Sequence, residues 1–126
     1  MRFLVLVKSD KEWSGEVPSA EMGAFNARLE KDGVLLAAEG LQPSSKGARI
    51  KYENGRAAVT DGPFTETKEL VAGFWIVQAR SKDELIERFS HCPFDNQHLE
   101  VRQLFEAEDF PGTRVGTLSP ALDRAG

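Results

Sequence analysis

The sequence predicts an α+β domain in which two helices cover one sheet. Apolar runs of strand length occur at residues 3–7, 34–38 and 71–77. A helical apolar pattern lies between the first two runs, and a second helical pattern follows the third. An Asn-Gly pair at residues 54–55 marks a tight hairpin in the middle of the chain. The order β-α-β, hairpin, β-α-β fits the split arrangement of a ferredoxin-like β-α-β-β-α-β sheet with both helices on one face.

Length and composition describe one globular domain. The chain has 126 residues, of which 40% are hydrophobic and 29% are charged, and no apolar run is long enough to cross a bilayer. The net charge of −4 gives no electrostatic reason to expect a nucleic acid or an anionic membrane as a partner. The start of the chain is basic and then apolar, but its apolar part is too short for a signal peptide, so a first strand is the better interpretation.

The cysteine and histidine content favours a cytoplasmic protein without a metal centre. Cys92 is the one cysteine of the sequence, so a disulfide within the chain is not possible and a reducing compartment is expected. One cysteine and two histidines are too few for the usual structural zinc sites. No metal and no cofactor are predicted.

The first half of the chain predicts one helix and the hairpin. Ser19 suits the N-cap of the helix, and Gly33 suits the position just after its end. The apolar stripe of this helix consists of Met22, Phe25 and Leu29. Apolar and polar residues alternate over residues 50–53, which predicts a half-buried strand, and the return strand of the hairpin is Arg56–Thr60.

The second half of the chain predicts a central strand, a helix and a last strand. Ser81 and Glu84 have the spacing of a capping box at the start of the second helix. The inner face of this helix is expected to consist of Leu85, Ile86 and Phe89. Cys92-Pro93 ends the helix, and the alternation over His98–Glu106 predicts the last strand.

The apolar strands predict a homodimer. Residues 3–7 and 71–77 are apolar on both faces of the sheet, whereas the two helices cover one face. The second face would be a large exposed apolar patch, which face-to-face packing of two sheets would remove. The domain is expected to cover residues 1–106, and residues 107–126 form an extension that is expected to pack on the body or on the partner subunit.

The polar stretch Asp61–Glu69 and its surroundings resemble a known family. The stretch reads Asp-Gly-Pro-Phe-Thr-Glu-Thr-Lys-Glu; Gly73-Phe74 follows it, and Glu39-Gly40-Leu41 precedes it. These motifs resemble the DGPF group of the YCII-related proteins, and the resemblance extends from about Met1 to about Phe105. It implies a dimeric α/β-barrel built on a ferredoxin-like fold, with a cleft between the two sheets.

The resemblance implies little about chemistry, because the family is largely uncharacterised. Some relatives are proposed to use a His–Asp pair, a few act on chlorinated aromatic breakdown products, and members often occur beside sigma-factor genes. This sequence departs from the His–Asp relatives, because Asp61 has no adjacent histidine. Its two histidines, His91 and His98, lie in or near the second helix and the last strand.

The loop Asp61–Glu69 supplies the candidate acid–base residues. Asp61 and Lys68 are the candidate catalytic residues, because a lysine near a carboxylate lowers the pKa of that carboxylate. Glu66, in the same loop, is a candidate ligand-binding residue. Charged loops at strand ends beside an apolar cleft are where sites tend to lie. The alternative is that Asp61 caps the turn that follows it and that the rest of the loop is a solvated surface.

Two charged residues outside this loop are candidates for ligand binding, and each has a structural alternative. Glu39 follows an apolar run and would face the cleft, or else it pairs with Arg49, Arg56 or Arg102. Arg102 lies on the polar face of the last strand, where its guanidinium would hold an anionic ligand. The alternative for Arg102 is an ion pair with Glu100 or Glu39.

Trp75 is the remaining candidate ligand-binding residue. Together with Trp13 it would form the floor of a pocket for an aromatic molecule, or else, as a residue of the central strand, it belongs to the core. Two functions are consistent with these candidates. The first is a small-molecule enzyme or binding protein with its site between the sheet and the Asp61–Glu69 loop. The second is a non-catalytic dimeric module that binds a protein partner in transcriptional regulation.

Overall fold

The computed structural model describes residues 1–11, 18–64 and 70–110, and its strands and helices follow the predicted order. The elements are β1 (Arg2–Ser9), α1 (Ala20–Lys31), β2 (Leu35–Gly40), the 3-10 turn η1 (Ser44–Lys46), β3 (Ala48–Glu53), β4 (Arg56–Asp61), β5 (Leu70–Gln78), α2 (Lys82–Phe89), β6 (His98–Gln103) and the 3-10 turn η2 (Ala107–Asp109). The predicted α+β class is therefore confirmed.

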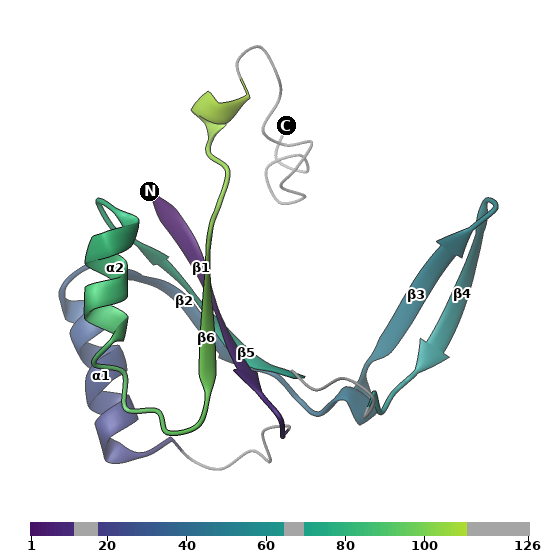
Figure 1. Ribbon diagram of the computed structural model, residues 1–126, viewed down its shortest axis with the longest axis horizontal. Helices are drawn as coiled ribbons and strands as arrows, with labels where there is room; N and C mark the ends of the chain where they lie inside the picture. The colour runs from purple at the N-terminus through teal and green to yellow at the C-terminus, as the bar shows by residue number, and fades with distance from the viewer. Residues whose placement is uncertain (12–17, 65–69, 111–126) are drawn as a thin grey trace.

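Four of the strands form one antiparallel sheet in the order β2-β5-β1-β6. β1 and β2 run in the same direction on either side of β5, and α1 joins them. β5 and β6 likewise lie on either side of β1, and α2 joins them. Both helices lie on the same face of the sheet (Figure 1). This is the split arrangement of a ferredoxin-like sheet, as the sequence predicts.

The core lies between this sheet and the helices. Buried side chains alternate with more exposed ones along β1 and β5, because successive residues of a strand point to opposite faces. The core consists of Phe3, Val5, Val7, Leu29, Val34, Trp75, Val77, Leu85 and Phe89. Burying one large apolar side chain contributes roughly 1.5–3 kcal/mol relative to leaving it exposed. The other residues of the same strands point to the opposite face of the sheet.

The ends of both helices are set by their own sequence. The hydroxyl of Ser19 accepts a hydrogen bond from the backbone N–H of Met22 at 3.1 Å, and that of Ser81 accepts one from Glu84 at 3.1 Å. Gly33, just after α1, has a φ of 70°, which favours glycine. The predicted N-caps Ser19 and Ser81 and the predicted position of Gly33 are thus confirmed, whereas only one of the two bonds of the predicted capping box is present. Within the described residues, neither helix is long and apolar enough to span a membrane.

Helix α2 differs from the prediction at one position. Leu85 and Phe89 face the sheet and are buried, whereas Ile86 is 47% exposed. Consecutive residues of a helix are rotated by about 100° around its axis. Ile86 therefore points away from the layer that buries Leu85, and its predicted place on the inner face is wrong.

β3 and β4 form a separate two-stranded hairpin, which we call the arm. The chain reverses at Asn54 and Gly55, whose φ angles of 52° and 74° suit a tight hairpin turn, as predicted. Every residue of β3 and β4 is exposed. Figure 1 shows that the arm extends away from the body, on the side of the sheet opposite to the helices.

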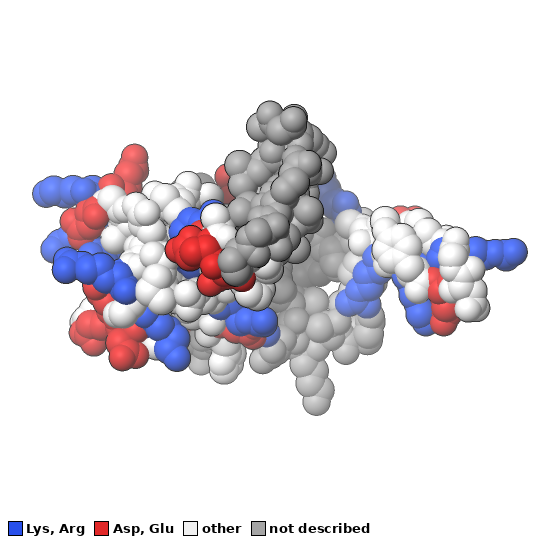
Figure 2. All heavy atoms as spheres, turned by 90° about the horizontal axis from the view of Figure 1, so that it is seen from above, with Lys and Arg blue, Asp and Glu red and all other residues white. Residues whose placement is uncertain are grey.

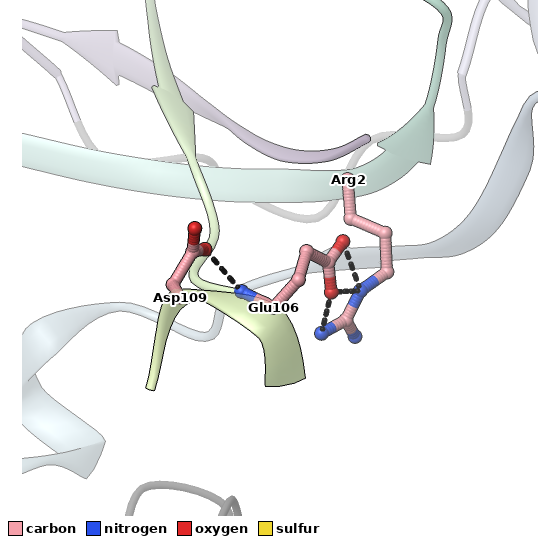
Figure 3. Close-up of polar contacts among 3 residues, drawn as sticks. All are labelled: Arg2, Glu106 and Asp109. Atoms are coloured by element: carbon pink, nitrogen blue, oxygen red, sulfur yellow. Dashed lines mark hydrogen bonds and ion pairs between the residues drawn. The ribbon is translucent and has the colours of Figure 1, made fainter. Parts of the chain in front are cut away.

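The last strand is shorter than predicted, because β6 ends at Gln103. The residues after β6 remain bonded to the start of β1. The carbonyl oxygen of Arg2 accepts a hydrogen bond from the N–H of Leu104 at 2.9 Å. The Arg2 guanidinium also contacts the Glu106 carboxylate at 2.8 Å. The backbone N–H of Glu106 in turn donates to the Asp109 carboxylate at 2.7 Å (Figure 3). These contacts connect the residues just before η2 to the start of β1.

Replacing Leu29 by alanine tests this arrangement of the core. The side chain is 1% exposed, so its removal leaves a cavity and should lower the free energy of unfolding by about 2–5 kcal/mol. Ile86→Ala is the matched control, because it removes an exposed apolar side chain from a helix and should change stability by less than about 0.5 kcal/mol. Chemical denaturation followed by circular dichroism measures both. Equal losses in the two variants would contradict the structure.

Candidate functional site

The face of the four-stranded sheet opposite to the helices, which we call the open face, has an apolar centre. Leu4 pairs in register with Ile76, and Leu6 pairs with Phe74. Directly opposed residues of antiparallel strands share a face, so all four side chains lie together. All four are partly buried. An apolar patch of this kind marks a binding surface or an interface.

A group of three charged side chains borders this centre on the β6 side. The Lys8 ammonium donates to one oxygen of the Glu100 carboxylate at 2.7 Å, and the Arg102 guanidinium donates to the other at 3.3 Å. Glu100 is the register partner of Leu6, and Arg102 is that of Leu4. The group therefore lies directly beside the apolar centre. Among the described residues, two cations thus share one carboxylate at this edge.

Within this group, Glu100 is held in its charged form. The hydrogen bond from Lys8, followed by that from Arg102, holds the pKa of the Glu100 carboxyl below its usual value. The Lys8 side chain is 22% exposed, whereas the Arg102 side chain is 72% exposed. Of these two cations, Arg102 is therefore the more accessible to a ligand. Its contact with Glu100 is also the ion pair that the sequence left open as an alternative.

Glu39 lies on the open face at the opposite edge. It pairs in register with Phe74, which pairs with Leu6, which pairs with Glu100, so one row crosses the whole sheet. Neighbouring strands lie about 4.8 Å apart, so roughly 14 Å separate the backbones of Glu39 and Glu100. This distance excludes an ion pair between Glu39 and Arg102 within one chain. The structure brings both candidates to one face but not into contact.

The tetrapeptide that begins at Asp61 builds the base of the arm. Asp61 is the last residue of β4 and is exposed. The backbone N–H of Gly62 donates to the carbonyl oxygen of Gly47 at 3.0 Å, and that of Phe64 donates to the Ser44 hydroxyl at 2.9 Å. These bonds join the end of the arm to the turn η1, from which the arm begins.

Close packing at this base explains two residues of the tetrapeptide. A Cβ atom on Gly62 would overlap the carbonyl oxygen of Ser44, so no other residue fits without a backbone shift. The guanidinium carbon of Arg49, in β3, lies 4.0 Å from the centre of the Phe64 ring, which is a cation–π contact. Phe64 thus anchors the arm and is not part of the domain core.

The predicted site residues do not all lie in one place. Asp61 belongs to the arm and not to the four-stranded sheet. Trp75 is 5% exposed, and its indole N–H donates to the Asn26 side-chain oxygen at 2.8 Å within the helix-covered core. This is the structural alternative that the sequence left open for Trp75. Lys68 and Glu66, like Trp13, lie outside the described residues.

The sequence analysis did not predict Lys8 and Glu100 as site residues. A signal for their orientation was present, since Lys8 is in phase with Leu4 and Leu6, and Glu100 is in phase with Arg102. The alternation of apolar and polar residues, however, indicates only the face of the strand on which each side chain lies. The pairing of β1 with β6 is what places the lysine against the carboxylate.

A groove of about 470 Å³ lies between the two helices. It is lined by Phe25, Arg28, Leu29, Asp32, Glu84, Glu87, Arg88 and His91. The Asp32 carboxylate accepts from Arg88 at 2.8 Å and from Arg28 at 3.3 Å, and these contacts, Arg88 first, hold its pKa below the usual value. The open face is the stronger candidate, because there the charged group lies beside an apolar centre of four side chains.

Cys92 is an unreactive thiol in this structure. Burial raises the pKa of its thiol to about 11, so the nucleophilic thiolate is scarce at neutral pH. In the parts of the chain that the structure describes, no three His, Cys, Asp or Glu side chains form a group that could hold a metal ion.

Comparison with known sequences relates the whole architecture to one family. The sequence model of the YCII-related domain matches residues 1–108, a range that contains both helices, the sheet and the arm. An uncharacterised protein of Rhizobium meliloti (strain 1021) is 30% identical over 94 residues, which span 69% of this chain and 76% of that protein. The arm is therefore within the matched domain and is not an addition to it.

Gly62→Ala tests the close approach at the base of the arm. The added methyl group overlaps the Ser44 carbonyl oxygen, so we expect a loss of about 1–3 kcal/mol in the free energy of unfolding. Gly47→Ala is the matched control in the same turn, because its Cβ would lie 3.6 Å from that oxygen, an ordinary contact. Urea denaturation of both variants gives the comparison. If Gly62→Ala is as stable as Gly47→Ala, the tetrapeptide does not pack as described.

Acid titration tests the contact between Lys8 and Glu100. The folded state lowers the pKa of the Glu100 carboxyl, so this contact stabilises the fold above the unfolded glutamate pKa of about 4.3. Its contribution is lost as the pH falls through the folded value. Between about pH 6 and pH 3, wild-type stability should therefore fall more steeply than that of Glu100→Gln. Denaturant titrations at each pH measure the slope, with Glu30→Gln on the exposed side of α1 as the control. The same slope in wild type and Glu100→Gln would refute the contact.

Proposed function

We propose that this protein, which belongs to the YCII-related domain family, is a homodimer that binds a small molecule at the open face of its sheet. One observation carries the proposal: an apolar centre and a group of two cations and one carboxylate lie side by side on that face. The centre consists of Leu4, Leu6, Phe74 and Ile76, and the group consists of Lys8, Glu100 and Arg102. This combination suits an aromatic or aliphatic molecule that carries a carboxylate or a similar anionic group.

A second copy of the chain would turn this face into a cleft. A single sheet face is open to water, whereas binding sites for small molecules enclose most of the ligand surface. Two sheets packed face to face lie about 10 Å apart, and side chains from both fill the space between them. The partner sheet would therefore form the roof over the apolar centre and shield the ligand from water.

The charged residues have separate roles in this proposal. Arg102 binds the anionic group of the ligand, because its guanidinium is the accessible one. Lys8 and Glu100 hold that guanidinium in place through the shared carboxylate. Glu39, at the far edge of the face, accepts a hydrogen bond from the other end of the ligand or from the partner. A carboxylate that two cations keep charged supports binding more directly than it supports proton transfer.

Asp61 has a smaller place in this function than the sequence suggested. Asp61 ends β4 at the base of the arm, and the neighbouring Gly62 and Phe64 make hydrogen bonds that hold that base together. We infer that Asp61 has a structural role, which is to cap the turn that follows it. The tetrapeptide also supports a place for the chain in the DGPF group of the family. The one cysteine of the sequence supports a cytoplasmic location.

The alternative function is a non-catalytic dimeric module that binds a protein partner. It requires apolar surface that remains exposed after the open faces have met. The arm is the described segment that favours this function, because Ile50, Tyr52 and Val59 are each more than half exposed. The two functions therefore differ in what covers the arm.

Binding of aromatic carboxylates tests the proposed function. In a thermal-shift screen, several such molecules should raise the melting temperature of the wild type, and their neutral amides should not. Arg102→Gln should weaken the binding at least tenfold, since a hydrogen bond to a charged group contributes about 1.5–3 kcal/mol. Arg80→Gln is the matched control, because the Arg80 side chain is 93% exposed and its ion-pair partner is Glu84 in α2. Equal affinity in the two variants, or no carboxylate that binds the wild type, would refute the proposal.

A further inference from the structure

The arm has one apolar and one polar face. Ile50 pairs in register with Val59, and Tyr52 pairs with Ala57, so these four side chains lie on one face. The opposite face carries Arg49, Lys51, Glu53, Arg56, Ala58 and Thr60. An alternation of this kind is typical of a strand pair with one face packed and the other in water.

The apolar face of the arm is open among the described residues. Tyr52 is 78% exposed, Val59 is 64% exposed and Ile50 is 52% exposed. An isolated two-stranded hairpin is at best marginally stable in water, and hairpins gain stability when they pack against a further element. The pattern therefore indicates that this face has a partner in the assembled protein.

The base of the arm presents this face in a defined direction. The hydrogen bonds of Gly62 and Phe64 to the η1 region, together with the Arg49–Phe64 contact, join both strands of the arm to the point where it leaves the body. An element fixed at its base loses less freedom on docking than a flexible loop does. The arm is therefore suited to hold a partner.

We propose that the apolar face of the arm docks on a second copy of this chain, beside the contact between the two open faces. The proposal extends the homodimer of the proposed function. The sheet face of one copy covers roughly 400 Å², so a contact between two such faces buries roughly 800 Å² in total, from strand spacing and rise. Stable interfaces bury about 1,200–2,000 Å². Two arms and the patches they cover add roughly 800 Å², which brings the total into that range.

Charge also favours a second copy as the partner. The arm carries three cationic and two anionic side chains, whereas the chain has a net charge of −4. Figure 2 shows Lys and Arg side chains on the arm, which stands apart from the body. The three cations lie on the polar face of the arm, so they favour the approach of an acidic copy, while the apolar face makes the contact. A two-fold axis makes this contact twice and closes the assembly, which arm-to-body contacts in an open chain of copies would not do.

Two neighbouring residues of β4 give a matched pair of variants. Val59→Asp places a charge on the apolar face of the arm, and Ala58→Asp places the same charge on the polar face of the same strand. Light scattering and sedimentation should give about twice the 13.9 kDa chain mass for the wild type and for Ala58→Asp. For Val59→Asp the dimer should dissociate at least tenfold more readily, with an unchanged far-ultraviolet circular dichroism spectrum. If Val59→Asp dimerises as tightly as Ala58→Asp, the proposal is overturned.

Cross-linking locates the contact without a disruptive substitution. A photoreactive benzoylphenylalanine in place of Tyr52 keeps an aromatic ring on the apolar face. Irradiation of the purified protein should give a covalent dimer on a denaturing gel, and the same residue in place of Lys51, on the polar face, should give much less. Equal yields from the two positions, or a cross-link within the chain alone, would overturn the proposal even if Val59→Asp does not fold.

Leu6→Asp, on the open face, separates this proposal from the proposed function. If it abolishes the dimer and Val59→Asp does not, the contact between open faces stands and the arm contact fails. If Val59→Asp abolishes the dimer and Leu6→Asp does not, the arm contact stands and the sheet-face cleft fails. A wild-type protein that is monomeric at micromolar concentration overturns both.

Discussion

The four-stranded sheet is apolar on both faces, but its two helices form only one layer. Phe3, Val5 and Val7 of β1 meet that layer and are buried, whereas Leu4 and Leu6 of the same strand point to the open face. The rest of the structure depends on this imbalance. It places an apolar centre where a ligand or a second sheet can pack, and it makes the edges of that face the natural position for charged residues. An apolar surface of this kind is stable in water only when something covers it.

The arm, in the middle of the chain, likewise has an apolar face that the described elements do not cover. Its strands alternate as if one face were packed, yet Tyr52 on that face is the most exposed large apolar side chain among the residues that the structure describes. The tetrapeptide at its base serves this geometry. Gly62 is required by the close approach of the Ser44 carbonyl, and Phe64 supports Arg49. The tetrapeptide Asp61–Phe64 thus has a structural explanation, which is the orientation of the arm, and this explanation requires no reaction at Asp61.

The charged edge of the open face matters more for the proposed recognition of a ligand than for the stability of the fold. Glu100 accepts hydrogen bonds from Lys8 and Arg102, and on an exposed surface such pairs contribute little to the stability of the fold. Their position is more informative than their energy. A cation beside an apolar centre provides the two contacts that an amphipathic anion needs, and Glu39 at the other edge adds a carboxylate roughly 14 Å away. In the proposed function, this geometry selects ligands by charge and by length.

The sequence by itself determined the features that depend on near neighbours in the chain. The caps at Ser19 and Ser81 and the turn at residues 54–55 each involve a few consecutive residues, so the local sequence contains the whole signal. The alternation of the strands separated two faces but did not say which one the helices cover. Only the tertiary structure decided that Trp75 points to the core and that Lys8 meets Glu100. Those two residues are 92 positions apart, and the register of strands distant in sequence, which no local pattern encodes, brings them together.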